Sequence, residues 1–203
     1  MGRMKSALRP PTITTPEEVP LEKQPSPVSI VLAAGAFAAH KHRDQRRKGA
    51  DASPYINHPI AVANVLANEA GITEPTILAA ALLHDTIEDT ATTPLELEAE
   101  FGVDIAAIVA EVTDDKSLPK QERKRLQIEH AATISNPAKL VKLADKICNV
   151  RDMSQSPPVN WSHERRGEYF IWAKQVVDQL RGVSPKLEGL FDAAYARRPG
   201  TSN

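Results

Sequence analysis

The sequence has a single cysteine, Cys148, among its 203 residues. An intrachain disulfide is therefore impossible, and a reducing cytoplasmic location is the default expectation. Aromatic residues make up only 4% of the chain. The longest apolar run, from Ile30 to Ala39, falls far short of the roughly 20 residues that a membrane-spanning helix needs. These shortages exclude disulfide-stapled and membrane-spanning proteins, and no membrane partner is expected.

The sequence also lacks an excess of either charge, because 25 basic and 26 acidic residues leave a net charge of −1. Proteins that bind nucleic acid are more often basic overall, so no nucleic-acid partner is expected. The charges are nevertheless segregated: no Lys or Arg occurs between Gly49 and Asp115, and basic residues crowd on both sides. This pattern suits a cation held among carboxylates beside a basic surface for a small polyanion. The simpler alternative is a set of solvated helix faces.

Proline is concentrated at the start of the chain. Residues 1–27 contain six of the sixteen prolines and no aromatic residue, so they have little apolar surface to offset the entropy of ordering. We predict a disordered extension over residues 1–27, one domain over residues 28–196, and a short disordered tail over residues 197–203.

Apolar residues recur at helical spacing from Val28 onward, and no stretch alternates as a strand does. Capping residues, prolines and glycines mark the expected ends of the helices. The sequence therefore predicts an all-α fold. The expected helices cover residues 30–48, 58–71, 73–88, 93–101, 103–112, 119–130, 137–150, 162–181 and 184–195.

Polar side chains interrupt these apolar helices at a few places. His84 and Asp85 directly follow an apolar segment, where an ionised carboxylate is costly unless a cation or hydrogen bonds compensate it. On a continuous helix, Glu88 and Asp89 would share a face with them, since they lie three or four residues further on. Imidazole and carboxylate ligands without thiolate suit Mn²⁺, Fe²⁺ or Zn²⁺ in an open site.

A second helix carries Asp145 and Asn149 four residues apart, so one can ligate a metal while the other orients a substrate or a water molecule. Each feature alone has a simpler explanation. A His-Asp pair at a helix end is commonly a cap or a core hydrogen bond, and His58 alone is commonly just a helix N-terminal residue. Cys148 is expected to pack rather than to act as a nucleophile. The joint occurrence of the features favours a metal site.

Taken together, these residues resemble the HD-domain phosphohydrolases, whose metal-binding signature matches His58, then His84-Asp85, then Asp145. The chain is similar in particular to the small alarmone hydrolases, stand-alone relatives of the hydrolase half of RelA/SpoT proteins, including the animal members. The similarity extends over about residues 33–169. It is carried by Tyr55-Ile56-Asn57-His58-Pro59, Ala81-Leu82-Leu83-His84-Asp85-Thr86-Ile87-Glu88-Asp89-Thr90 and Val112-Thr113-Asp114-Asp115-Lys116.

This resemblance implies a compact multi-helix HD-domain bundle that hydrolyses guanosine tetra- or pentaphosphate (ppGpp or pppGpp). The products would be GDP or GTP and pyrophosphate, and the reaction would lower alarmone levels in the stringent response. The resemblance also implies one Mn²⁺ ion, for which Zn²⁺ or Fe²⁺ could substitute. Its implied ligands are His58, His84, Asp85 and Asp145.

The implied catalytic residues are Glu88 and Asp89, which would support attack by water. Asn149 would help to hold the substrate, with Arg47 and Lys48 beside it. Lys142 and Lys146 are weaker candidates for neutralising the polyphosphate. The sequence does not fix an oligomeric state.

Two other classes of function stay open. One is a different nucleotide hydrolase, such as an NADPH 2′-phosphatase or another HD-type phosphohydrolase. The other is a metal-bound nucleotide sensor without catalysis, against which the presence of Glu88 and Asp89 argues. The matches at Tyr55 and over residues 113–116 favour the alarmone branch.

Overall fold

The computed structural model describes residues 26–49 and 51–198. Most of the predicted extension and of the predicted tail, residues 1–25 and 199–203, therefore lies outside the described residues. The expected boundary at residue 27 is slightly late. Ser26 is already the N-cap of the first helix, and its side chain accepts a hydrogen bond from the Ser29 amide at 3.2 Å.

The described residues form ten α-helices and one π-helix, and their only strand-like pairing is an isolated bridge between Arg46 and Pro54. The all-α class is confirmed. The helices are α1 (Pro27–Lys41), α2 (Asn57–Asn64), the π-helix η1 (Val65–Ala70), α3 (Pro75–Leu83), α4 (Thr86–Asp89), α5 (Pro94–Phe101), α6 (Val103–Val112), α7 (Lys120–Ala131), α8 (Asn136–Gln155), α9 (His163–Asp178) and α10 (Pro185–Ala196).

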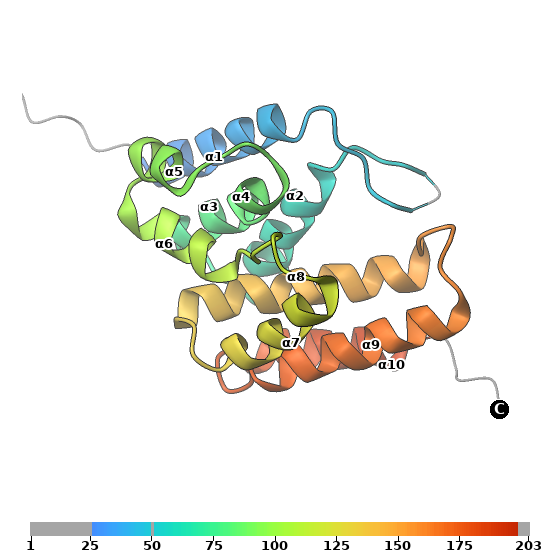
Figure 1. Cartoon of the computed structure of the whole chain (residues 1–203). Helices are drawn as coiled ribbons and strands as arrows, with labels where there is room; N and C mark the ends of the chain where they lie inside the picture. Colours follow the sequence, from blue (N-terminus) through green and yellow to red (C-terminus); the bar gives the residue numbers. More distant parts are fainter. Residues whose placement is uncertain (1–25, 50, 199–203) are drawn as a thin grey trace, which may run out of the picture.

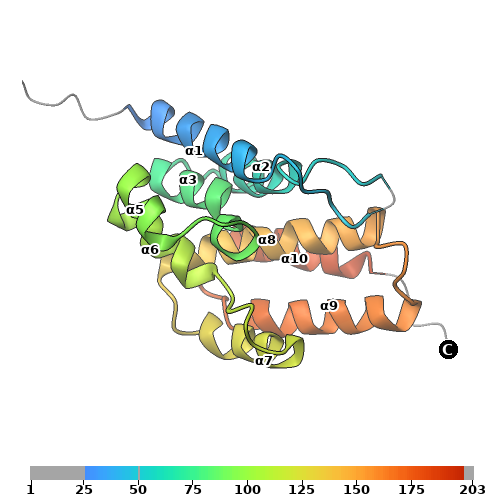
Figure 2. The same ribbon diagram turned by 45° about the horizontal axis from the view of Figure 1, so that its top comes forward.

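Helix α8 lies between the amino-terminal helices and α9 in both views (Figures 1 and 2). It contacts α2, α3 and α6 on one side and α9 and α10 on the other. Helix α3 packs against α1, where fully buried alanines such as Ala34, Ala38 and Ala80 allow close approach. Burial of these apolar surfaces supplies the main driving force for folding. The two central helices, α3 and α8, also deliver polar residues to the middle of the molecule.

The expected helix over residues 30–48 is too long, because α1 ends at Lys41. His42 is almost fully buried, and Arg47 reaches Asp152 of α8 at 2.6 Å. These tertiary contacts favour a loop over continuation of a charged helix that has no apolar face. The loop that follows α1 therefore contacts the centre of the fold through His42 and Arg47.

The expected continuous helix over residues 73–88 is also wrong, because it breaks between α3 and α4. Side chains compete there for the backbone carbonyls. His84 Nδ1 lies 2.8 Å from the Ala81 carbonyl oxygen, and the Thr86 hydroxyl donates to the Leu83 carbonyl oxygen at 2.7 Å. Such local hydrogen bonds offer the backbone an alternative to the helical ladder. The assumption of one helical face for residues 84–89 therefore fails.

The end of α8 and the geometry of the helix that begins at Asn57 also differ from expectation. Helix α8 continues to Gln155 instead of ending at Val150, because Met153 is buried and Arg151 forms a two-pronged ion pair with Glu69 at 2.7 and 2.8 Å. The helix expected over residues 58–71 changes to π geometry from Val65 to Ala70. The expected spans of α5 and α6 agree with the structure.

Candidate metal centre and active site

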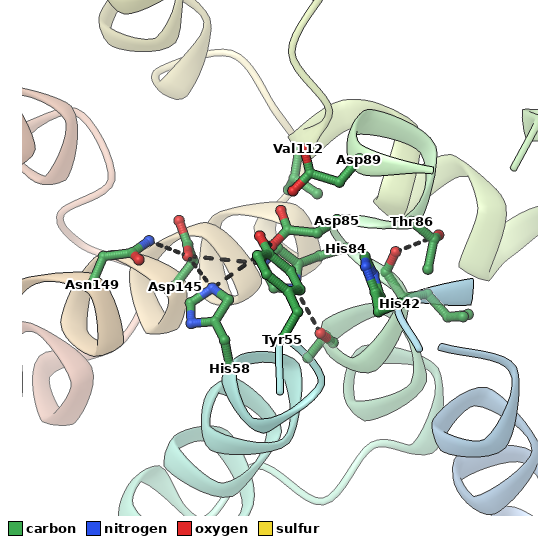
Figure 3. A network of polar contacts seen from close by, with 12 residues as sticks. His42, Tyr55, His58, His84, Asp85, Thr86, Asp89, Val112, Asp145 and Asn149 are labelled. Carbon is green, nitrogen blue, oxygen red and sulfur yellow. Dashed lines mark hydrogen bonds and ion pairs between the residues drawn. The ribbon is translucent and has the colours of Figure 1, made fainter. Parts of the chain in front are cut away.

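Four polar side chains from separate elements meet in the middle of the fold (Figure 3). His58 lies in the first turn of α2, His84 and Asp85 lie at the junction of α3 and α4, and Asp145 lies within α8. One ligand atom from each of His58, His84 and Asp145 lies within 4.8 Å of the other two. Residues up to 87 positions apart in the sequence thus form one cluster of nitrogen and oxygen donors.

The imidazole nitrogens face the carboxylates at short distances. His58 Nε2 lies 3.1 Å from Asp145 Oδ1, and His84 Nε2 lies 3.1 Å from Asp85 Oδ2. The crossed pairs are somewhat longer, at 3.7 Å from His58 Nε2 to Asp85 Oδ2 and 3.8 Å from His84 Nε2 to Asp145 Oδ1. All four groups therefore converge on one small volume.

His84 is arranged as a metal ligand. Its Nδ1 donates to the Ala81 carbonyl oxygen at 2.8 Å, which leaves Nε2 to face the carboxylates. Nε2 is buried and, although Asp85 Oδ2 lies 3.1 Å away, it makes no hydrogen bond of acceptable geometry within the described part of the chain. Burial alone lowers the pKa of His84, but Asp85 and Asp145 outweigh it and raise the pKa to about 9. The position therefore attracts positive charge, either as a proton or as a cation that displaces it.

The two carboxylates are held in the ionised form. Burial would raise the pKa of Asp145, but Lys146 and His58 outweigh burial and hold that pKa well below its usual range. The pKa of Asp85 is likewise lowered, since His84 and His58 outweigh the effect of its burial. The side chains of Asp85 and Asp145 are only 18% and 14% exposed. Two ionised carboxylates with so little access to water, next to two imidazoles, suit a divalent cation, because such charges need compensation.

Asp145 is the centre of a wider network on α8. Its Oδ1 accepts a hydrogen bond from Asn149 Nδ2 at 2.5 Å, and its Oδ2 accepts one from Lys146 Nζ at 3.0 Å. Arg47 Nη2 donates to Asn149 Oδ1 at 3.1 Å and to Asp152 Oδ2 at 2.6 Å. Sequence reasoning missed Asp152, although its position seven residues after Asp145 and three after Asn149 places it along the same helix face.

A cleft of about 600 Å³ opens beside this network, a size typical of small-molecule sites. Arg47, Lys48 and Asn149 all line it, so the structure brings these three predicted substrate-binding residues together. The aromatic side chains Trp161 and Tyr169 line the same cleft. Sequence reasoning missed both aromatic residues, because their sequence positions carry no recognisable pattern.

A second, much smaller chamber of about 40 Å³ lies on another side of the cluster. Three of the four candidate ligands line it, namely His84, Asp85 and Asp145. Glu88 lines this chamber, whereas Asp89 lines the large cleft. Adjacent residues of a helix point about 100° apart, so the two neighbouring carboxylates of α4 face different spaces.

Lys142 and Lys146 also line the small chamber and not the large cleft. Both side chains are nearly fully buried. Lys142 Nζ donates to the Val112 carbonyl oxygen at 3.3 Å, and Lys146 Nζ lies 4.9 Å from the centre of the Trp172 ring as well as next to Asp145. Their assignment as cations for the substrate stays a prediction.

The environments of Glu88 and Asp89 also differ. Burial, together with the nearby carboxylates of Asp114 and Asp85, raises the pKa of Glu88 to about 7. The nearest basic group is Arg123, whose Nη1 lies 3.7 Å from Glu88 Oε1. Asp89 instead forms an ion pair with Lys116. Glu88 can therefore exchange a proton near neutral pH, while the charge of Asp89 is compensated.

Comparison with known proteins adds independent findings. A model of the HD domain family matches residues 34–174. The chain is 56% identical over 170 residues to the guanosine-3′,5′-bis(diphosphate) 3′-pyrophosphohydrolase MESH1 of Xenopus tropicalis, a match that covers 84% of this chain and 95% of that protein. It is 54% identical over 173 residues to the protein of the same name from Homo sapiens, with 85% and 97% covered.

A solved structure is similar as well, and it is described as a metazoan ortholog of SpoT that hydrolyzes ppGpp and plays a role in starvation responses. The TM-score is 0.82 at 50% sequence identity, and the match covers 87% of this chain and 98% of that one. The resemblance drawn from the sequence motifs is thereby confirmed. Among the described residues, no helix combines the length and the apolar character needed to cross a membrane.

Replacement of a candidate ligand should abolish stabilisation by metal. A ligand that binds only the folded state stabilises it, so Mn²⁺ at 100 times its dissociation constant should contribute about 2.7 kcal/mol in the wild type. We expect this gain to disappear in His84→Ala. The exposed His130 provides the matched control, because His130→Ala should keep the full gain. Melting temperatures with and without Mn²⁺ test this, and equal gains in the two variants would exclude His84 as a ligand.

The raised pKa of Glu88 predicts a pH-dependent effect on stability. A carboxyl group whose pKa is about 7 when folded and about 4.5 when unfolded destabilises the folded state progressively as the pH rises between these values. Glu88→Gln removes this penalty. For the metal-free protein, we expect the variant to gain on the order of 2 kcal/mol over the wild type at pH 8 and little at pH 5. Denaturant titrations at both pH values measure the gain, and an equal gain at both would contradict the raised pKa.

Proposed function

The chain belongs to the HD-domain family, and from that membership we propose that it is a guanosine-3′,5′-bis(diphosphate) 3′-pyrophosphohydrolase that requires one divalent metal ion. The observation that carries this proposal is the convergence of two imidazoles and two ionised carboxylates next to a cleft lined by Arg47 and Lys48. Identity above 50% over nearly the full length of relatives with this activity supports it. The reaction adds water to the 3′-pyrophosphate linkage and releases GDP or GTP with pyrophosphate.

His58, His84, Asp85 and Asp145 would hold the ion. The buried His84 Nε2, which faces Asp85 without forming a hydrogen bond, and the two largely buried, ionised carboxylates fit a cation. We propose Mn²⁺ because the ligand set combines nitrogen and oxygen without sulfur, with Zn²⁺ and Fe²⁺ as alternatives. When bound, a divalent cation supplies Lewis-acid activation of a phosphoryl oxygen and of a water molecule.

Glu88 is the better candidate for accepting the proton of the attacking water. It shares the small chamber with three of the candidate ligands, and about 40 Å³ is enough for an ordered water molecule. A pKa of about 7 suits a general base near neutral pH. Asp89 faces the cleft and is paired with Lys116, so we assign it a role in orienting the reactants.

The large cleft would receive the nucleotide. Arg47 and the exposed Lys48 provide positive charge for phosphate groups, and the Asn149 amide lies between Arg47 and Asp145. Trp161 and Tyr169 offer aromatic surface against which a guanine base can pack. Lys142 and Lys146 line only the small chamber, so we propose that they act on the reacting phosphoryl group.

The partner is thus a small guanosine polyphosphate. We propose no nucleic-acid or membrane partner and a reducing, cytoplasmic location, with which the single buried Cys148 is compatible.

Product analysis tests the proposed activity and the metal. Metal-stripped protein is incubated with ppGpp, pppGpp or NADPH, and Mn²⁺, Mg²⁺, Zn²⁺ or Fe²⁺ is restored separately. We expect GDP or GTP together with pyrophosphate, most rapidly with Mn²⁺, and separation by chromatography identifies them. Release of inorganic phosphate and NADH from NADPH, without turnover of ppGpp, would replace the proposal with the phosphatase function. Binding of ppGpp without any product would instead indicate a sensor.

The division of roles between the two neighbouring carboxylates predicts different kinetic effects. Glu88→Gln should keep the affinity for Mn²⁺ and lower kcat by about 10²–10⁴-fold, the usual contribution of a general base. Asp89→Asn keeps a polar group in the cleft and should lower kcat less. Metal titrations and steady-state kinetics at saturating Mn²⁺ measure both parameters. A Glu88→Gln enzyme with wild-type kcat would remove Glu88 from the chemistry.

A further inference from the structure

The shortest helix of the site needs support from outside. Helix α4 consists of Thr86–Asp89 and has no side-chain hydrogen bond at its N-cap, Asp85. A single turn is not stable by itself, because helix nucleation is costly. Yet α4 carries Glu88 and Asp89 and begins next to the candidate ligand Asp85. Contacts from another element must therefore set the positions of these groups.

The loop between α1 and α2 contacts the amino-terminal end of α4 through Tyr55. The Tyr55 hydroxyl donates a hydrogen bond to Asp85 Oδ2 at 2.7 Å. This is the same oxygen that lies 3.1 Å from His84 Nε2 and 3.7 Å from His58 Nε2. Tyr55 thus fixes the orientation of the carboxylate with respect to both imidazoles (Figure 3).

The same loop contacts the other end of α4. Gln45 Nε2 donates to the Asp89 carbonyl oxygen at 2.6 Å, and a carbonyl at this position otherwise lacks a helical partner. This hydrogen bond to Asp89 fixes the orientation of the Gln45 amide, so that its Oε1 accepts a hydrogen bond from His42 Nδ1 at 2.5 Å. The single loop therefore holds α4 at both of its ends.

His42 connects the two contacts. Its side chain is only 1% exposed, and its ring is stacked on the Tyr55 ring with 4.8 Å between centroids and an interplanar angle of 29°. The hydrogen bond to Gln45 orients the His42 ring, and the ring in turn supports Tyr55. The chain of contacts thus runs from Asp89 through Gln45, His42 and Tyr55 to Asp85.

We propose that Tyr55 is a positioning residue for the metal ligand Asp85, and that His42 and Gln45 hold Tyr55 and α4 in the arrangement that this role requires. The inference rests on the proposed function only in taking Asp85 as a ligand. Tyr55 also lines the large cleft, and its ring lies 5.6 Å from the Arg47 guanidinium carbon. Its hydroxyl acts on the metal site, whereas its ring faces the nucleotide.

Tyr55→Phe separates these two roles, because it removes the hydroxyl and keeps the ring. Metal affinity is measured by titrating metal-free protein with Mn²⁺ alone, without nucleotide. We expect the Mn²⁺ dissociation constant to rise about 10- to 100-fold, as is usual when a hydrogen-bond partner of a ligand is lost. At saturating Mn²⁺, KM for ppGpp should stay within about twofold of the wild type. Tyr195→Phe is the matched control, since Tyr195 packs on α10 against Phe191, and its Mn²⁺ affinity should be unchanged.

An unchanged Mn²⁺ affinity in Tyr55→Phe would overturn the proposal, and a raised KM would then assign the hydroxyl to the nucleotide. Gln45→Leu tests the other end of α4 independently: at saturating Mn²⁺ we expect a lower kcat with KM nearly constant, whereas a wild-type kcat would contradict the role of the loop. Failure of the wild type to release pyrophosphate from ppGpp would refute the proposed function instead. The Mn²⁺ titrations, which contain no nucleotide, would still decide the role of Tyr55.

Discussion

The partial burial of two ionised carboxylates beside two imidazoles is the constraint on which the rest of this structure depends. Asp85 and Asp145 keep their charges only because His58, His84 and Lys146 surround them. A cluster of this kind is unfavourable in an apolar core unless positive charge is supplied. The surrounding helices can thus be understood as a frame that brings four donors from distant parts of the chain to a cation.

The helices also connect the candidate metal site to the large cleft. Helix α8 carries Asp145, Asn149 and Asp152 along one side, so it connects the candidate metal site to Arg47 and the large cleft. Within α4, the adjacent side chains of Glu88 and Asp89 point in different directions, so one lines the small chamber and the other lines the cleft. Two neighbouring carboxylates on one short helix are thereby given different surroundings beside the same candidate metal site.

Local sequence patterns predicted the elements whose determinants are local. The Thr93-Pro94 cap and the apolar spacing after Val103 were enough for α5 and α6. Local patterns could not predict the end of α1. Arg47 pairs with Asp152 of α8, 105 residues away, and His42 is buried by packing on Tyr55 of the following loop. The same limit applies to the site. Motif order indicated His58, His84 and Asp145, but the separate surroundings of Glu88 and Asp89 and the contact from Tyr55 to Asp85 arise only in the folded chain.

Anomalous X-ray diffraction from crystals grown with Mn²⁺ tests the central claim most directly, because it locates the ion without reference to activity. The account predicts one strong peak within ~2–2.5 Å of a nitrogen of His58 and of His84 and of a carboxylate oxygen of Asp85 and of Asp145. A peak bound by other side chains, or none at this cluster under conditions that support turnover, would contradict it.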